Sequence, residues 1–312
     1  MSLPIEADKQ GAMPPAVKKA TFIRMFQSFK AYKLLPSPYL LVSKFSMEMS
    51  RFSYYYTFII RGFTSILFCT ILFANHKNCS ICLQPLDNTF SVDVWGNAFH
   101  TAHEQEGVFC HSCSRIISQG VTQGGYIYSD GRHLCSLCRL TAVNDDSVIQ
   151  AAYLSVISQF EKVGIIHIPT DIAINLVELQ ILNQKAGKLS HIKLKGFTRI
   201  EPVFNKISQP DNSFQIFILF GLPRIEFESV LAHELLHIWL HQNQIRLSLE
   251  TEEGFCNLGQ YLIYQNDHTQ FATIHLQAME NDPDPIYGLE YRKMKTKLKQ
   301  KGWKNLILYL LN

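Results

Sequence analysis

The residues His233-Glu-Leu-Leu-His237 are of the types that hold and use a metal ion. On an α-helix each residue advances about 100° around the axis, so the two histidines lie one turn apart on the same face. Their imidazoles can therefore bind one zinc ion, and the carboxylate of Glu234 lies beside them as a general base rather than as a ligand. The chemistry that this pattern indicates is metal-assisted hydrolysis.

A helix over residues 230–242 must carry these side chains. Its apolar residues fall in one broad arc that can pack into a core, while the two histidines and Glu234 fall in the remaining wedge. His241 lies on the same wedge but about 6 Å further along the axis, so we expect it at the rim of the site. An apolar helix with two incidental histidines is the alternative. The arc consists of Leu231, Leu235, Leu236, Ile238, Trp239 and Leu240.

A third ligand distinguishes the two interpretations. Zinc sites with two histidines on one helix can take that ligand from a carboxylate further along the chain. Residues 250–253 read Glu-Thr-Glu-Glu and open a second stretch with apolar periodicity. We expect Glu253 to be the ligand, because its place directly before Gly254 resembles the context of the third ligand in zinc peptidases of the two-His, one-Glu type. Glu252 and Glu250 are the alternatives if the helix begins earlier.

A cysteine-rich block before residue 140 contains two further sets of metal-ligand residues. Their spacing suits two tetrahedral zinc sites. Disulfides are the alternative, but histidines at ligand spacing favour metal. Alternating stretches between the cysteines predict hairpins that are too small to fold without metal. The first set is Cys79, Cys82, His100 and His103, and the second is Cys110, Cys113, Cys135 and Cys138.

Length and charge limit the classes of function. The 312 residues have room for two modest domains and an appendage. The formal charge of +3 is small for this length, and no basic stripe with interleaved aromatic residues is present. We therefore expect no nucleic-acid binding.

Residues 52–75 form a hydrophobic segment that is charged only at Arg61, and basic residues are concentrated before it. If translation begins near Met47 or Met49, the segment is typical of a signal peptide. Otherwise it is a single membrane anchor with its basic side in the cytoplasm, and a buried helix is the remaining alternative. A membrane-anchored or exported location is favoured over a cytoplasmic one, with membrane association through residues 52–75.

The segments around the metal helix have their own patterns. Ser147 is expected to cap a helix over residues 148–160, and Asp171 a helix over 172–184 that Gly187 ends. Alternating residues predict strands at 164–168, 191–197 and 214–220. We expect the last of these to be the sheet edge that pairs with extended substrate beside the metal helix. A further helix is predicted over 269–280.

Together the two zinc regions resemble the DA-one-like family of plant LIM-domain proteins with a C-terminal zinc peptidase. The resemblance covers roughly residues 78–312. It implies an α+β fold in which a zincin-like metallopeptidase domain, built from a small sheet and an active-site helix, follows a small LIM-like domain with two zinc sites. The residues that carry it are His233-Glu-Leu-Leu-His-Ile-Trp-Leu, Glu252-Glu-Gly-Phe-Cys and Pro285-Ile-Tyr-Gly.

The expected organisation has four parts. Residues 1–51 are a weakly ordered basic region, and residues 52–75 are the hydrophobic segment. Residues 76–140 are the LIM-like zinc-binding domain, and residues 141–312 are the zinc metallopeptidase domain.

The expected function is zinc-dependent hydrolysis of peptide bonds in protein substrates, with one catalytic and two structural zinc ions. His233, His237 and Glu253 hold the catalytic ion, and Glu234 takes a proton from water and passes it to the leaving amine. A tetrahedral oxyanion needs another donor, for which Tyr287 is the candidate and His275 the alternative. The competing hypothesis is a catalytically inert LIM-type adaptor that docks a protein partner. The intact general base disfavours it.

Overall fold

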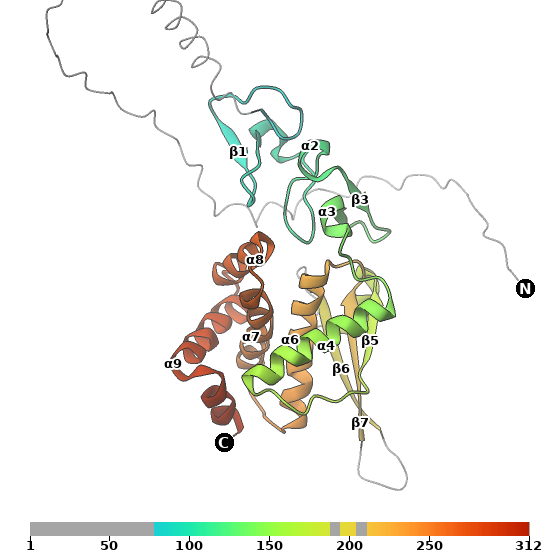
Figure 1. The fold of residues 1–312 in the computed structure, drawn as a ribbon, viewed down its shortest axis with the longest axis vertical. Helices are drawn as coiled ribbons and strands as arrows, with labels where there is room; N and C mark the ends of the chain where they lie inside the picture. Colours follow the sequence, from blue (N-terminus) through green and yellow to red (C-terminus); the bar gives the residue numbers. More distant parts are fainter. Residues whose placement is uncertain (1–77, 188–193, 204–210, 312) are drawn as a thin grey trace, which may run out of the picture. The chain divides into compact units, whose positions relative to one another are not determined.

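The computed structural model describes residues 78–187, 194–203 and 211–311 (Figure 1). These residues belong to one compact unit, Thr70–Asn312. The predictions for residues 1–51 and for the hydrophobic segment 52–75 lie outside the described residues. None of the described helices combines the length and the apolar composition that crossing a membrane requires.

The cysteine block contains two small antiparallel hairpins, as predicted. Strand β1 (Phe90–Val92) pairs with β2 (Ala98–His100), and β3 (Gly125–Ile127) pairs with β4 (His133–Cys135). The turn of the second hairpin passes through Gly131, whose φ of 84° suits glycine. Three short helices complete the block: η2 (Thr101–Glu104), α2 (Gln119–Thr122) and α3 (Ser136–Arg139). The small apolar cores are built around the cysteines themselves.

The first long helix, α4 (Asp146–Val163), is capped by a residue other than the predicted one. The carboxylate of Asp145 accepts hydrogen bonds from the backbone N–H groups of Ser147 and Val148. The prediction that Ser147 caps this helix is therefore wrong. The Ser147 hydroxyl itself donates a hydrogen bond to the carboxylate of Asp145, which is the N-cap residue.

Residues 164–187 differ most from the prediction. Residues 165–169 have no regular structure, so the predicted strand at 164–168 is wrong. The predicted helix over 172–184 is also wrong. Its residues form strand β5 (Ala173–Val177) and the short helix α5 (Leu179–Ala186), which ends at Gly187 as expected. Pairing of β5 with a distant strand decides this, since short apolar segments do not distinguish helix from strand by themselves.

The three-stranded sheet has the order β5-β7-β6, with β6 (Gly196–Val203) antiparallel and β5 parallel to β7 (Asp211–Leu219). Strand β7 is therefore the central strand, and the prediction that residues 214–220 form the sheet edge is wrong. Consecutive residues 216–219 are buried, as expected for a strand that is covered on both faces. The edge beside the metal helix is β6.

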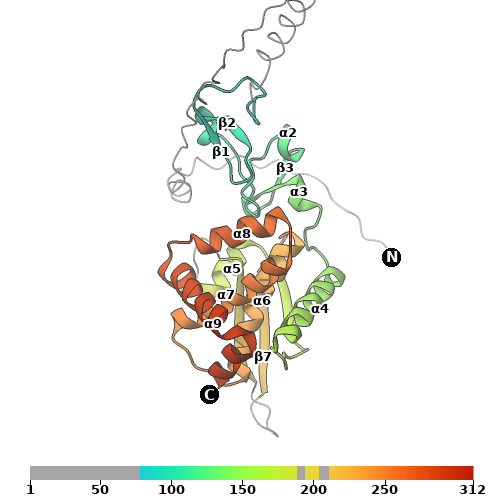
Figure 2. The ribbon, with the colours of Figure 1, turned by 60° about the vertical axis from the view of Figure 1, so that its left-hand side comes forward.

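The helices that follow pack on this sheet and on one another (Figure 2). Helix α6 (Arg224–Gln242) begins six residues before the predicted range and lies against α7 (Leu249–Asn266). The two backbones approach closely, because a Cβ on Gly259 would lie 2.8 Å from the carbonyl oxygen of Ala232. The predicted helix over 269–280 is confirmed as α8 (Gln270–Glu280), and the π-helix η4 (Pro285–Leu289) leads into α9 (Glu290–Leu311), which is kinked at Gly302. The described residues thus form an α+β fold.

Candidate metal centre

Helix α6 presents the His-Glu motif to the protein interior. His233 and Glu234 are 7% and 5% exposed, and the apolar arc of the helix is buried in the core. The Nε2 atoms of His233 and His237 lie 3.1 Å apart, so both imidazoles turn the same nitrogen toward one point.

Glu253, on the second turn of α7, completes the group. Its Oε2 lies 3.2 Å from His233 Nε2, and its Oε1 lies 3.7 Å from His237 Nε2. Ligand atoms about 2 Å from a shared zinc ion lie up to about 4 Å apart, so these separations suit one bound ion. Two imidazoles and one carboxylate are the donor set of a zinc site that keeps a position open. The structure thus brings together the residues His233, His237 and Glu253.

The neighbouring carboxylate of Glu252 has a different place. Its Oε1 lies 2.8 Å from Nδ1 of His237, on the side of the ring away from the shared point. A carboxylate that accepts from the second ring nitrogen holds the imidazole in the tautomer whose Nε2 can bind metal. Gln260 lies in the corresponding position beside His233, 3.4 Å from its Nδ1.

Replacing Glu252 with alanine should therefore weaken metal binding without abolishing it. Loss of such a partner typically lowers metal affinity about 10- to 100-fold. The measurement is zinc retention at the α6–α7 site during titration with a chelator. Glu250→Ala, at an exposed residue of the same helix, is the matched control, and equal zinc retention in both variants would contradict this role for Glu252.

Glu234 lies outside the ligand group. Its Oε2 accepts a hydrogen bond of 2.7 Å from the hydroxyl of Thr198 on β6. This carboxylate therefore lies beside the metal-ligand group and is held by β6 rather than by the ligands. Sequence patterns do not single out Thr198, because it is remote from the motif along the chain.

Tyr287 lies close to the same group. Its backbone is fixed by η4, where the Asp284 carboxylate accepts from its N–H and the Asn257 amide donates to its carbonyl. Burial, together with the nearby carboxylates of Glu253, Asp284 and Glu234, raises the pKa of the Tyr287 phenol. The hydroxyl therefore keeps its proton and can donate a hydrogen bond.

The alternative donor, His275, is not part of this group. Its ring stacks on Tyr264 at 5.0 Å and lies 4.3 Å from the ring of Phe271. Burial lowers the pKa of His275 to about 4, and the charges that act on it most are those of Glu226 and Lys195. These contacts give no support to His275 as an oxyanion donor. His241 is exposed and its ring packs on Phe214, as expected for a residue at the rim.

The cysteine block forms two compact groups of ligand atoms, each within 4.8 Å of one another. The first is Cys79, Cys82, His100 and His103, and the second, which we call the four-cysteine group, is Cys110, Cys113, Cys135 and Cys138. The cysteines among the described residues are not joined in disulfides. Burial opposes ionisation of Cys79, but backbone N–H groups that donate to its sulfur lower its pKa to about 6. Thiolates held in this way could bind zinc.

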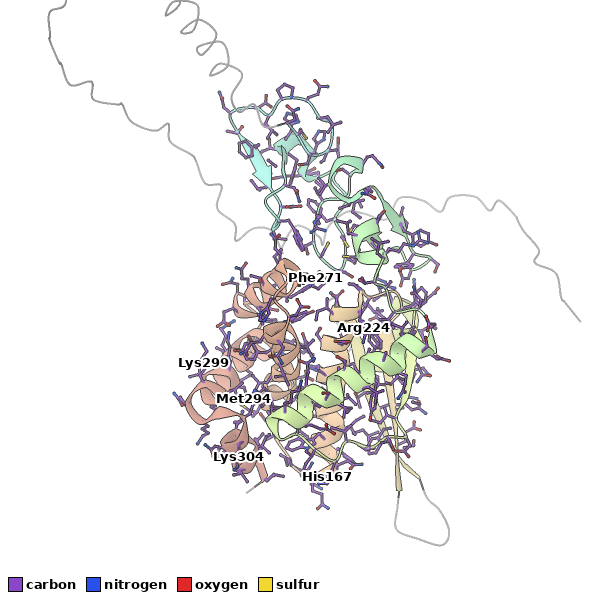
Figure 3. All side chains as sticks on the ribbon, viewed as in Figure 1. His167, Arg224, Phe271, Met294, Lys299 and Lys304 are labelled. Carbon is purple, nitrogen blue, oxygen red and sulfur yellow. The ribbon has the colours of Figure 1, made fainter. Side chains whose placement is uncertain are left out.

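The four-cysteine group is joined to the start of α6, a connection that the sequence did not reveal. Arg132, beside the turn of the second hairpin, pairs with Asp130 and donates a hydrogen bond of 2.8 Å to the carbonyl of Phe220. The N–H of Arg224, the first residue of α6, donates to the carbonyl of Thr141. Figure 3 labels Arg224 and also Phe271, whose ring packs against the four-cysteine core.

The α+β fold and its groups of Cys, His and Glu residues define a protein with candidate zinc-binding sites, in which LIM-type spacing precedes a His-Glu-x-x-His helix. Residues 148–274 match the family model described as "DA1-like: Protein DA1". This segment contains the whole of α6 and α7, and therefore His233, Glu234, His237 and Glu253. Over these residues the chain is similar to that family.

The chain is similar to several curated plant proteins. It is 28% identical over 229 residues to LIM domain-containing protein HDR3 of Oryza sativa subsp. japonica. This alignment covers 62% of this chain and 45% of that protein. It is 26% identical over 230 residues to Protein DA1-related 2 and 26% identical over 220 residues to Protein DA1, both of Arabidopsis thaliana, covering 62% and 59% of this chain. The chain spans less than half the length of these relatives. No solved structure matches it.

Proposed function

We propose that the chain is a zinc-dependent endopeptidase with a zincin-like catalytic region and a LIM-like accessory block. The observation that carries this proposal is the convergence of two imidazole nitrogens and the Glu253 carboxylate on one point, with Glu234 beside them and outside the ligand set. The similarity to LIM-containing and DA1-like proteins supports the same architecture.

Each residue has a defined role in this proposal. His233, His237 and Glu253 would hold zinc, which supplies the Lewis acidity that lowers the pKa of a water molecule toward neutrality and polarises a peptide carbonyl. Glu234 accepts the proton of the attacking water and donates it to the leaving amine. The phenol of Tyr287 donates a hydrogen bond to the oxygen on which negative charge develops.

The substrate would bind in an extended conformation. Strand β6 is the sheet edge beside α6, and Thr198 joins it to Glu234. An extended peptide can pair with such an edge through backbone hydrogen bonds, which gives affinity without requiring one particular side chain. We therefore propose protein or peptide substrates, and a protein partner docked by the LIM-like block.

Metal content tests this proposal. The purified chain should contain three zinc ions, two in the Cys and His groups and one at the α6–α7 site. The last ion should be removed first by a chelator, because a site with three protein ligands and an open position binds less tightly than a closed one. Cleavage should disappear with this ion and return when zinc is restored. Two tightly held ions and no cleavage would instead identify a LIM-type adaptor.

A further inference from the structure

We infer that Thr198 and Gly196 of β6 are positioning residues that hold the Glu234 carboxylate in place for proton transfer. The inference rests on the proposed function, because it concerns how the general base of that reaction is oriented. Neither residue is a metal ligand, and both lie far along the chain from the His-Glu motif.

The two residues face α6 from the same side of β6. Side chains two positions apart on a strand point to the same face of the sheet. The Thr198 hydroxyl lies 2.7 Å from Oε2 of Glu234. The next residue, Arg199, points to the other face, where its guanidinium lies over the ring of Phe217. Gly196 and Thr198 therefore form the part of β6 that lies against Glu234.

Thr198 fixes the rotation of the Glu234 carboxylate. The hydroxyl has one proton, and the carboxylate oxygen is nearer than the Glu234 backbone carbonyl, which is 3.2 Å away. A hydrogen bond to a charged acceptor is also the stronger of the two. The last torsion of a glutamate side chain is broad and weakly restrained. The bond to Oε2 therefore restricts the plane in which Oε1 can accept a proton.

Gly196 makes room for the other carboxylate oxygen. A Cβ at this position would lie 2.5 Å from Glu234 Oε1 and 2.6 Å from Cγ1 of Val230. Both distances are well inside van der Waals contact, so any larger residue would displace the glutamate side chain or the strand. Thr198 thus binds Oε2 of Glu234, and Gly196 leaves space for Oε1 because it has no side chain.

The arrangement also relates the base to the substrate. A peptide paired with the edge of β6 takes its register from the backbone of that strand. Because Thr198 belongs to the same strand, the hydroxyl holds Glu234 in register with the bound peptide. A misplacement of about 1 Å can lower a rate about 100-fold, so this connection should affect the rate of proton transfer more than binding.

The test replaces Thr198 with valine, which keeps the shape of the side chain and removes its hydroxyl. We expect kcat to fall about 10- to 100-fold with KM unchanged, because the lost interaction orients the base rather than the substrate. Thr198→Ser should retain most of the wild-type kcat, since it keeps the hydroxyl. Gly196→Ala should lower kcat although the hydroxyl is present. Zinc content and the unfolding temperature should match the wild type in the threonine variants.

The assay uses a peptide from a library digest that the wild-type protein cleaves and Glu234→Gln does not. Thr296→Val, at an exposed residue of α9, is the matched control. Wild-type kcat in Thr198→Val would overturn the inference and leave the proposed function intact. Loss of zinc or earlier unfolding in Thr198→Val would assign Thr198 a structural role and also overturn it. If no peptide is cleaved by the wild type and left intact by Glu234→Gln, the proposed function itself is contradicted.

Discussion

Replacing Glu234 with glutamine should nearly abolish peptide cleavage while zinc remains bound. The amide oxygen of glutamine can still accept a hydrogen bond from the Thr198 hydroxyl. Glutamine also has nearly the same volume as glutamate, so the packing of α6 against β6 should persist. It cannot take a proton from water at neutral pH. A positioned general base typically contributes about 10²- to 10⁴-fold to a rate, and kcat should fall by that factor.

Mapping of cleavage sites in a proteome-derived peptide library, with wild-type protein and Glu234→Gln in parallel, measures this effect. Zinc content of both proteins shows whether the site is still intact. Glu161→Gln, at an exposed carboxylate on α4, is the matched control. A wild-type kcat in purified Glu234→Gln would remove Glu234 from the mechanism, even if zinc is bound as expected.

Replacing Cys135 with serine should unfold the second hairpin and also end cleavage. The four ligands of this group are buried, and the apolar core around them is small. Structural zinc contributes about 10–16 kcal/mol of apparent binding free energy, comparable to the about 5–15 kcal/mol by which a whole domain is stable. The hairpin therefore has little to hold it once the zinc site is lost.

Cleavage should be lost with it because the hairpin supports the start of α6. Arg132 donates to the carbonyl of Phe220, and Ala142 forms a β-bridge with Pro223. Cys82→Ser, in the first ligand group, is the comparison. Cys82 is exposed, and Cys79 of the same group packs with Phe99 and Ile116 in a core separate from that of the four-cysteine group. We expect this variant to lose one zinc ion and keep cleavage. Thermal unfolding, zinc content and cleavage are measured together, and wild-type values in Cys135→Ser would contradict the role of the hairpin.

The metal-ligand groups are recognisable from the amino-acid sequence alone. Two histidines four residues apart, and cysteine pairs at fixed spacing, are set by local geometry, because the ligand atoms of each pair lie within one turn of helix or one knuckle. The hairpin that turns at Gly131 and the helix that begins at Gln270 were predictable for the same reason. Their turn and cap residues act on backbone groups a few positions away.

The choice between Glu252 and Glu253 needed the tertiary structure. Adjacent residues on a helix point about 100° apart, and either carboxylate is close enough in sequence to serve. Helices α6 and α7 approach closely at Gly259. This packing turns Glu253 toward both histidines and Glu252 toward Nδ1 of His237.

The sequence by itself determined which residues could bind metal and where α4, α6 and α8 lie, and its family resemblance implied the α+β fold. The tertiary structure decided which strand forms the edge, why residues 173–177 are extended, and that Gly196 and Thr198 lie against Glu234. The physical reason is range. Spacing and capping depend on neighbours along the chain, whereas strand order and the surroundings of a carboxylate depend on segments that meet only when the core closes.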